Sequence, residues 1–160
     1  MDKQNIGNAG EYYIASVLSA NNFIATITLG RAEAYDILCV SPSGNTYKVS
    51  VKTRYDEIYN FPLNIKNESL EADDFFYAFV ILKKFENTPD FWIIPSKRVA
   101  EVLKNTSKRY FLTKKKDGGD RNDVGLRKLD FKVPTQKKKL YDDGWEEELT
   151  MYYKNFGLLK

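Results

Sequence analysis

The feature that most constrains the fold is the stretch of residues 35–54. Two apolar runs rich in β-branched residues flank a Ser-Pro-Ser-Gly-Asn segment at 41–45, which is a pattern typical of a β-hairpin. Side chains alternate between the two faces of a strand, so Lys48, Ser50 and Lys52 are expected to share one face of the second strand. The hairpin therefore predicts a polar row along one side of a sheet. This row is either solvated surface or part of a functional site.

The composition narrows the chemistry that the chain can perform. With 160 residues, of which 42% are hydrophobic and 29% charged, the chain has the size of one domain, and we expect residues 1–160 to form a single domain. The sequence contains no histidine. Cys/His zinc sites and Ser-His-Asp triads are therefore excluded. Catalysis has to use carboxylates, lysine, tyrosine or a metal ion held by oxygen ligands.

Cysteine usage and hydropathy indicate the cellular compartment. The single cysteine, Cys39, lies in an apolar run and cannot support a disulfide framework. No stretch is long and apolar enough to cross a bilayer, and the chain begins with polar residues rather than with a signal peptide. We expect a cytoplasmic protein with no membrane partner.

Positive charge is concentrated in one part of the chain. Residues 108–139 contain twelve Lys or Arg and four Asp or Glu, whereas the whole chain has a formal net charge of only +3. Such a segment suits contact with a polyanion, most commonly nucleic acid, although a solvated charged loop explains it equally well. The candidate nucleic-acid-binding residues are Arg54, Lys114, Lys115, Lys116 and Arg121.

The rest of the sequence predicts an α/β domain. Residues 55–74 are polar and are expected to be irregular, and residues 105–140 are expected to form a basic insertion that folds against the domain. The order helix, strand, hairpin places a sheet at the start of the chain. The other expected elements are a helix over about 8–21, strands over 23–29, 75–82 and 91–94, a helix capped by Ser96, and a C-terminal amphipathic helix within 142–159.

Glu11 stands out on the first expected helix because it shares a face with Ile14 and Leu18. A carboxylate is costly to bury on an apolar face unless a cation or a metal ion meets it. Alternatively, Glu11 lies one turn into the helix, partly exposed, and favours the N-terminal end of the helix dipole. The sequence leaves both explanations open.

Three ionisable residues follow one another in an order that suits metal-dependent chemistry. Glu11 lies on the first helix, Asp36 begins one strand and Lys52 ends the next. Hydrolysis of a phosphodiester with a divalent metal ion needs hard oxygen ligands, a water molecule that the metal activates, and a cation nearby. Asp36 could supply a ligand, the Val51 carbonyl a second, and Lys52 the cation.

This arrangement resembles the PD-(D/E)XK nuclease superfamily, which has the restriction-endonuclease-like fold. The likeness covers about residues 7–104, since the segments 75–82 and 90–96 also match the outline of small bacterial members. It implies a mixed β-sheet core flanked by helices, with the active site at one edge of the sheet. The residues that carry the likeness are Gly10-Glu11, Asp36-Ile37-Leu38 and Ser50-Val51-Lys52-Thr53.

The resemblance also implies a cofactor and roles for these residues. Mg²⁺ or Mn²⁺ would be held by Asp36, Glu11 and the Val51 carbonyl, and Lys52 would position the attacking water. The sequence departs from the family at Ser50, where members carry Glu, Asp or, in some branches, Gln.

The change at Ser50 removes a negative charge from a site that must hold a dication. Metal affinity should fall unless Glu11 or Glu33 compensates. Two functions remain open: a metal-dependent DNA endonuclease of restriction, repair or defence type, and an inactive nuclease-like module that binds nucleic acid or a protein partner. DNA is the expected partner, with RNA as the alternative, and family members often act as homodimers. A third and weaker alternative is a structural α/β protein whose basic loop binds acidic proteins.

Overall fold

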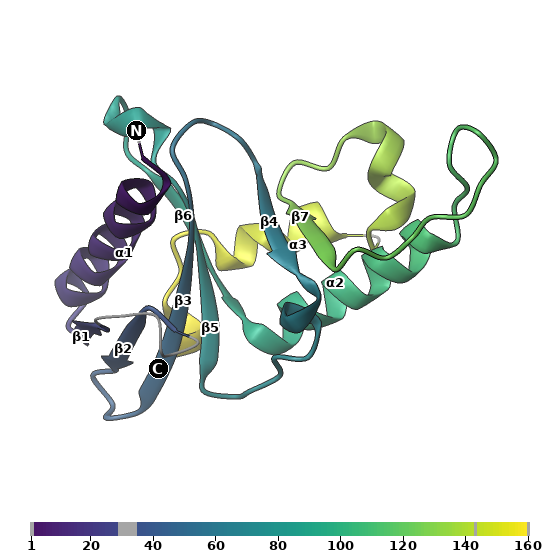
Figure 1. Cartoon of the computed structure of the whole chain (residues 1–160). Helices are drawn as coiled ribbons and strands as arrows, with labels where there is room; N and C mark the ends of the chain where they lie inside the picture. Colours follow the sequence, from purple (N-terminus) through teal and green to yellow (C-terminus); the bar gives the residue numbers. More distant parts are fainter. Residues whose placement is uncertain (1, 29–34, 143, 160) are drawn as a thin grey trace.

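The computed structural model describes residues 2–28, 35–142 and 144–159, which form a mixed α/β fold (Figure 1). Three short 3₁₀ helices, η1 (Ile65–Glu68), η2 (Lys83–Phe85) and η3 (Thr135–Leu140), lie between the longer elements of the described residues, and η4 (Gly157–Leu159) follows the last of them. The longer elements, in chain order, are α1 (Lys3–Ala20), β1 (Ile24–Ile27), β2 (Ile37–Val40), β3 (Thr46–Arg54), β4 (Asn60–Asn64), β5 (Phe75–Ile81), β6 (Asp90–Pro95), α2 (Ser96–Phe111), β7 (Leu126–Asp130) and α3 (Trp145–Tyr152).

The main sheet has five strands in the order β1-β2-β3-β5-β6. The β2–β3 pair is the predicted hairpin, and its turn contains Gly44 at a φ of 91°, a conformation that glycine adopts without strain. Strands β3 and β5 run parallel, whereas the other neighbours run antiparallel. The expected mixed sheet flanked by helices is therefore confirmed.

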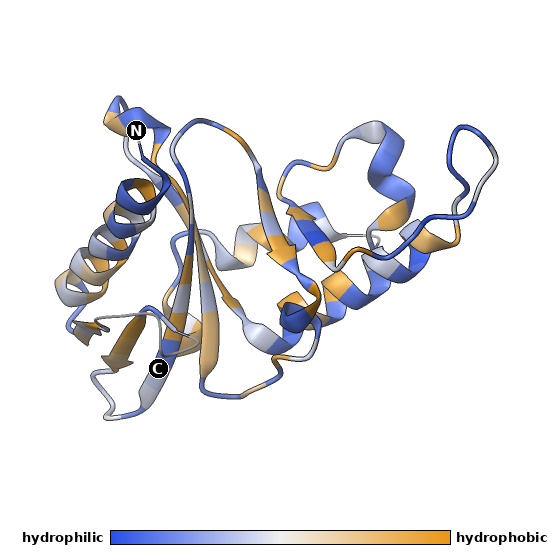
Figure 2. Cartoon of the chain, in the orientation of Figure 1, coloured by the Kyte–Doolittle hydropathy of each residue, from blue (hydrophilic) through white to orange (hydrophobic). Residues whose placement is uncertain are grey.

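The two faces of this sheet are covered by different parts of the chain (Figure 1). Helix α1 packs through Ile14 and Leu18 on the face that carries Val49 and Val51. The opposite face is covered by α2, α3 and a separate two-stranded ribbon formed by β4 and β7. Hydrophobic residues concentrate in the central strands, and the loop after α2 is mostly hydrophilic (Figure 2). Strand β5 is buried along its whole length, as its nearly continuous apolar sequence predicts.

The ribbon corrects the expectation that residues 55–74 are irregular, because β4 lies within them and pairs with β7. The sequence hid this strand for two reasons: it contains Pro62, and its partner lies more than 60 residues away. Pro62 is tolerated because it lies opposite Lys128, whose backbone carbonyl points away from β4 and accepts a hydrogen bond from the Tyr141 hydroxyl at 3.2 Å. Residues 105–140, expected to be an insertion, supply β7 and the core residue Phe131.

Three helix boundaries differ from the prediction. Helix α1 begins at Lys3, where the Asp2 carboxylate accepts a hydrogen bond from the Gln4 amide at 3.1 Å. Ser96 does not cap α2, because its hydroxyl is bound to the amide and carbonyl of Ala72. The C-terminal helix is only Trp145–Tyr152.

After α3, the chain passes along the outer edge of β6. Tyr153 forms a β-bridge with Trp92, and the Lys154 amide donates a hydrogen bond to the Phe91 carbonyl at 3.0 Å. Leu159 then packs into the core on the α1 side of the sheet. Within the described residues, no helix combines the length and the apolar character needed to cross a membrane.

Candidate active site

Asp36 lies where β2 begins, and its backbone is held from both sides. Its amide donates to the Val49 carbonyl at 2.9 Å, although Ile37 is the residue paired with Val49. Two successive residues therefore face Val49, which is the arrangement of a β-bulge, and a bulge re-aims the side chain that it carries. On the other side, the Thr28 amide donates to the Asp36 carbonyl at 3.0 Å. The carboxylate is thus fixed in direction before any ligand binds.

The Asp36 carboxylate begins a chain of hydrogen bonds that runs to Lys52. Its Oδ2 atom accepts from the Val51 amide at 2.6 Å and from the Ser50 hydroxyl at 3.2 Å. The Ser50 hydroxyl in turn accepts from Lys52 Nζ at 2.8 Å. The structure therefore brings Asp36, Ser50 and Lys52 together as the sequence predicts. Ser50 lies between the carboxylate and the ammonium, so it couples the two charges through a hydroxyl.

Lys52 projects from the sheet face opposite to α1, in the alternation predicted for β3. Its ammonium lies 6.0 Å from the centre of the Tyr77 ring, and Tyr77 is a core residue. Burial lowers the pKa of Lys52, while the charges of Asp36 and Glu11 act in the opposite direction. The polar row of the hairpin is therefore not solvated surface at this end, and Lys52 holds its proton less firmly than an exposed lysine does.

Glu11 reaches the same place from α1 because the helix lies very close to β3. A Cβ atom on Gly10 would lie 1.9 Å from Thr53 Oγ1, so only glycine allows this approach. Because α1 begins at Lys3, Glu11 lies in the middle of the helix, and the alternative role at its N-terminal end is wrong. Burial raises the pKa of Glu11, the Asp36 charge raises it further, and Lys52 lowers it.

The donor set at this edge of the sheet suits a hard divalent cation. Asp36 and Glu11 provide two carboxylates that repel each other, and no hydrogen bond to the Glu11 carboxylate comes from the residues that the structure describes. The N–H and C=O groups of a strand residue point the same way, so the Val51 carbonyl shares the edge of its amide. Mg²⁺ commonly binds through one or two carboxylates and keeps several water molecules.

The site is nevertheless sparse in acidic ligands. In the described ranges, no group of three or more His, Cys, Asp and Glu side chains is arranged to hold a metal ion. Glu33, the other residue expected to compensate for Ser50, lies outside these ranges. The two carboxylates and neutral oxygens therefore fit one hydrated ion better than a tightly enclosed one.

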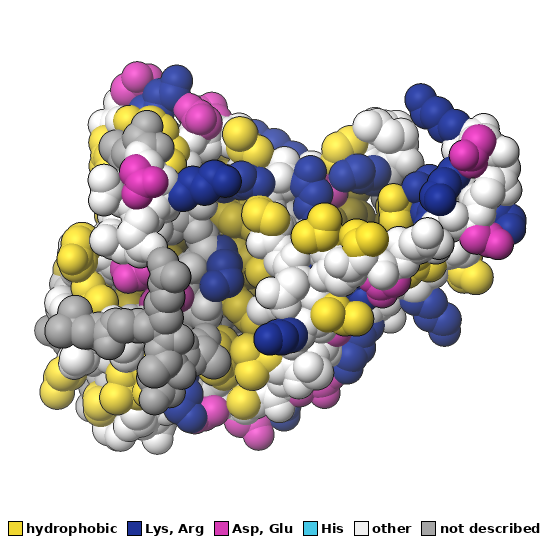
Figure 3. Space-filling model, in the orientation of Figure 1, with side chains coloured by type: hydrophobic (Ala, Val, Ile, Leu, Met, Phe, Trp, Pro, Cys, Tyr) yellow, Lys and Arg dark blue, Asp and Glu magenta, His cyan; other side chains and the backbone are white. Residues whose placement is uncertain are grey.

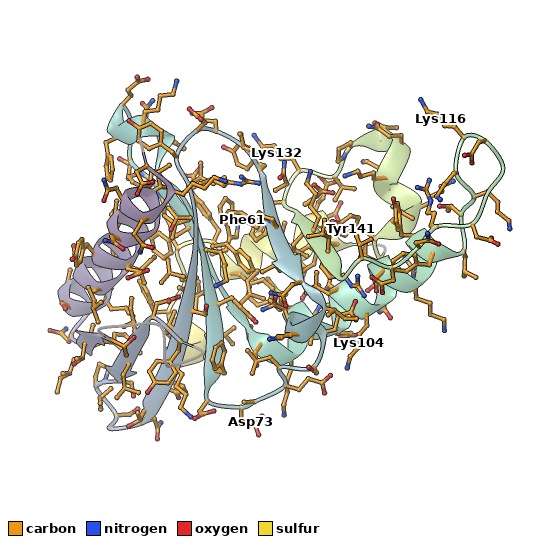
Figure 4. All side chains as sticks on the ribbon, in the orientation of Figure 1. Phe61, Asp73, Lys104, Lys116, Lys132 and Tyr141 are labelled. Atoms are coloured by element: carbon orange, nitrogen blue, oxygen red, sulfur yellow. The ribbon has the colours of Figure 1, made fainter. Side chains whose placement is uncertain are left out.

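The candidate nucleic-acid-binding residues fall into two groups. Arg54 and Arg121 hold the fold together: Arg54 donates to the Asn60 backbone and side-chain oxygens at 2.6 and 2.9 Å, and Arg121 donates to the Tyr110 hydroxyl at 2.8 Å. Lys114 forms an exposed ion pair with Asp120. Lys115 and Lys116 extend from the loop after α2, and Lys116 points away from the body of the molecule (Figure 4).

Two features of the site were not predicted from the sequence. The first is the contact of Gly10 with Thr53, for which the signal was a glycine within an otherwise helical segment, since glycine there often marks close packing. The second is Tyr77 beneath Lys52, which no local pattern distinguishes from the other aromatic residues of β5.

Comparisons with known proteins give little beyond this geometry. No protein-family model matches the sequence. No curated protein matches it. Among solved structures, the chain is similar to a bacterial homing endonuclease, I-Ssp6803I, with a TM-score of 0.46, 15% sequence identity and coverage of 94% of each chain.

Proposed function

We propose that the protein is a divalent-metal-dependent nuclease that hydrolyses phosphodiester bonds in DNA. The observation that carries the proposal is the convergence of Glu11, Asp36 and Lys52 where β2 begins. Burial and the Asp36 charge raise the pKa of Glu11 there, and burial lowers the pKa of Lys52. Such shifts concentrate at functional sites, although ion-pair networks also cause them. The mixed sheet flanked by helices also agrees with the fold that the resemblance implies.

The proposed roles follow from the position of each group. Asp36, Glu11 and the Val51 carbonyl would hold Mg²⁺ or Mn²⁺, which would supply positive charge at the phosphate and lower the pKa of a bound water. Val51 and Ser50 donate to Asp36 Oδ2 and so fix the carboxylate in one orientation. As an ammonium held by the Ser50 hydroxyl, Lys52 neutralises charge on the phosphate. Its neutral form, which the lowered pKa makes more accessible, can instead accept the proton of the attacking water and become the ammonium.

Cleavage of supercoiled plasmid DNA with Mn²⁺ tests this function. Asp36→Asn and Lys52→Met should each slow nicking by about 10²–10⁴-fold, since each removes a group proposed to act in the transition state. Lys97→Met is the matched control, because Lys97 forms an exposed pair with Asp73 away from the site. A wild type that does not nick, or nicking that survives both site variants, would refute the proposal.

The Ser50 hydroxyl favours a second function, that of a nucleic-acid-binding module without catalysis. This alternative predicts DNA binding that is the same with Mg²⁺ and with EDTA, and no stoichiometric metal binding in calorimetry. Ser50→Glu separates the two functions further. A gain of Mn²⁺ affinity or cleavage in this variant would mean that the scaffold is competent and that the missing carboxylate limits it.

A further inference from the structure

A second functional feature lies beside the ribbon, outside the Asp36 site. A pocket of about 550 Å³ is enclosed by the ribbon, α2, η3 and the segment 122–126. This volume lies within the range of small-molecule sites, roughly 300–1,000 Å³. Hydrophobic and Lys or Arg side chains lie side by side over the ribbon and the neighbouring loop (Figure 3). The apolar part of the wall includes Leu103, Leu126 and Leu140.

Flat groups line one end of this pocket. Tyr110 and Phe111, the last two residues of α2, both belong to the wall. The Arg121 guanidinium lies 4.3 Å from the centre of the Tyr110 ring, and the Arg127 guanidinium lies 5.6 Å from that of Phe111. Aromatic rings and guanidinium planes are the surfaces on which unpaired nucleobases stack.

Two lysines belong to the wall and differ in their surroundings. Lys128 is exposed, whereas Lys137 lies 3.1 Å from the buried carboxylate of Asp130. Lys128 is therefore the lysine of the wall that can contact a backbone phosphate.

The pocket is connected to the candidate active site through β3. Arg54 lines the pocket and lies two residues after Lys52 on the same face of the strand, a separation of about 7 Å. Its hydrogen bonds to Asn60 fix the ribbon beside the end of β3. The pocket therefore extends from the end of β3 along α2 to Tyr110, and a DNA strand that contacts both Lys52 and Tyr110 spans several nucleotides.

We propose that this pocket holds one unpaired nucleobase of a DNA strand, stacked against Tyr110, on the same strand as the phosphate at Lys52 and several nucleotides away from it. The inference rests on the proposed function and names its substrate class, namely DNA with unpaired nucleotides rather than uninterrupted duplex. An extruded base requires a shaped pocket with a stacking surface, and the backbone phosphates that flank it require cations. The ribbon, α2 and η3 supply both.

Binding of a single-stranded 12-nucleotide DNA that contains 2-aminopurine tests the inference. The titration is done in EDTA, so that it depends neither on bound metal nor on cleavage. The 2-aminopurine fluorescence should fall on binding to the wild type, because stacking quenches it. Tyr110→Ala should weaken binding about 5- to 150-fold, the effect of losing one stacked base, and Tyr110→Phe, which keeps the ring, should restore it. Tyr12→Ala is the matched control, since Tyr12 is an exposed tyrosine of α1 outside the pocket.

The outcomes separate this inference from the nuclease proposal. Equal affinities for wild type and Tyr110→Ala, or unchanged fluorescence on binding, would overturn the pocket assignment and leave plasmid cleavage to be judged by itself. Blunt duplex of the same sequence that binds as tightly as the single strand would also overturn it. The nucleotide dAMP binding as tightly as the oligonucleotide would mean that the ligand is a free nucleotide, contrary to the inference. Tyr110-dependent binding by a protein that does not cleave would support the pocket while refuting the nuclease.

Discussion

The charges at the start of β2 and the charges around the ribbon are arranged in opposite ways. At the start of β2, burial raises the pKa of Glu11 and lowers that of Lys52, so each ionised form is less stable than in water. Beside the ribbon, Arg127 lies between Glu68 and Asp123, and its hydrogen bonds lower the pKa of Asp123 to about 2. The charges around the ribbon are therefore stabilised by one another.

The difference between charges that burial destabilises and charges that pair with one another indicates which charges of a fold are available to a ligand. A group that the fold leaves in an unfavourable state gains from a bound ion, whereas a group already neutralised by its neighbours gains little. The basic character of residues 108–139 overstates their capacity to bind DNA, because Arg109 donates to the Tyr141 carbonyl and Arg127 is enclosed in ion pairs. The following predictions test this distinction.

The largest expected effect is on stability, from removal of the Arg127 guanidinium. Arg127→Ala leaves Glu68 partly buried without its cation, and should lower the free energy of unfolding by about 3–5 kcal/mol. Urea denaturation measures this change. Lys114→Ala, which breaks an exposed pair with Asp120, should cost less than about 1 kcal/mol. Similar losses for the two variants would contradict the structural role given to Arg127.

The next effect distinguishes two glycines of α1. Gly10→Ala places a methyl group against Thr53 and should destabilise the protein by about 1–3 kcal/mol. Gly7→Ala meets nothing within 4 Å and should stabilise it by about 0.5–1 kcal/mol, because alanine favours the helix. Thermal unfolding compares the two variants. Equal shifts in Tm would mean that α1 does not depend on the close contact that places Glu11.

A smaller stability effect tests the unfavourable state of Glu11. Because its pKa is raised in the folded protein, ionised Glu11 reduces stability at neutral pH, and the penalty is absent below its ordinary pKa of 4.5. Glu11→Gln should therefore raise Tm at pH 7 by less than about 4 °C, the equivalent of roughly 1 kcal/mol. The gain should shrink as the pH falls toward 4.5. The same variant should bind Mn²⁺ more weakly. A loss of stability at pH 7 would show that Glu11 is satisfied by the fold.

The smallest effect concerns the salt dependence of DNA binding. Lys115→Ala or Lys116→Ala should each reduce the slope of log K against log salt by about 0.7 if the ammonium contacts a phosphate of single-stranded DNA. Arg109→Ala should leave the slope unchanged, because its guanidinium is already bound to Tyr141 and Asp142. Anisotropy titrations at several salt concentrations provide the slopes. If Arg109→Ala changes the slope and the two lysine variants do not, then Arg109 contacts the phosphate and Lys115 and Lys116 do not.

The hairpin and its polar row could be predicted from the sequence because their signals are local. Alternation along β3 and the turn at Gly44 were sufficient to place Ser50 and Lys52 on one face. The ribbon could not be predicted, since β4 is short, contains Pro62 and is specified by a partner far along the chain. The same holds for the bulge at Asp36, which results from the register between strands rather than from any residue preference.

The position of residues 153–154 along the edge of β6 has a consequence for folding while the chain is being synthesised. Before these residues are synthesised, the outer edge of β6 exposes unpaired backbone groups at Phe91 and Trp92, and such an edge can pair with another chain. The Tyr153 bridge and the Lys154 hydrogen bond cover it only after α3 and residues 153–154 have been made. The segment that follows α3 thus protects the sheet against aggregation, so a chain shortened before Tyr153 should self-associate even though the sheet and the Asp36 site are unchanged in sequence.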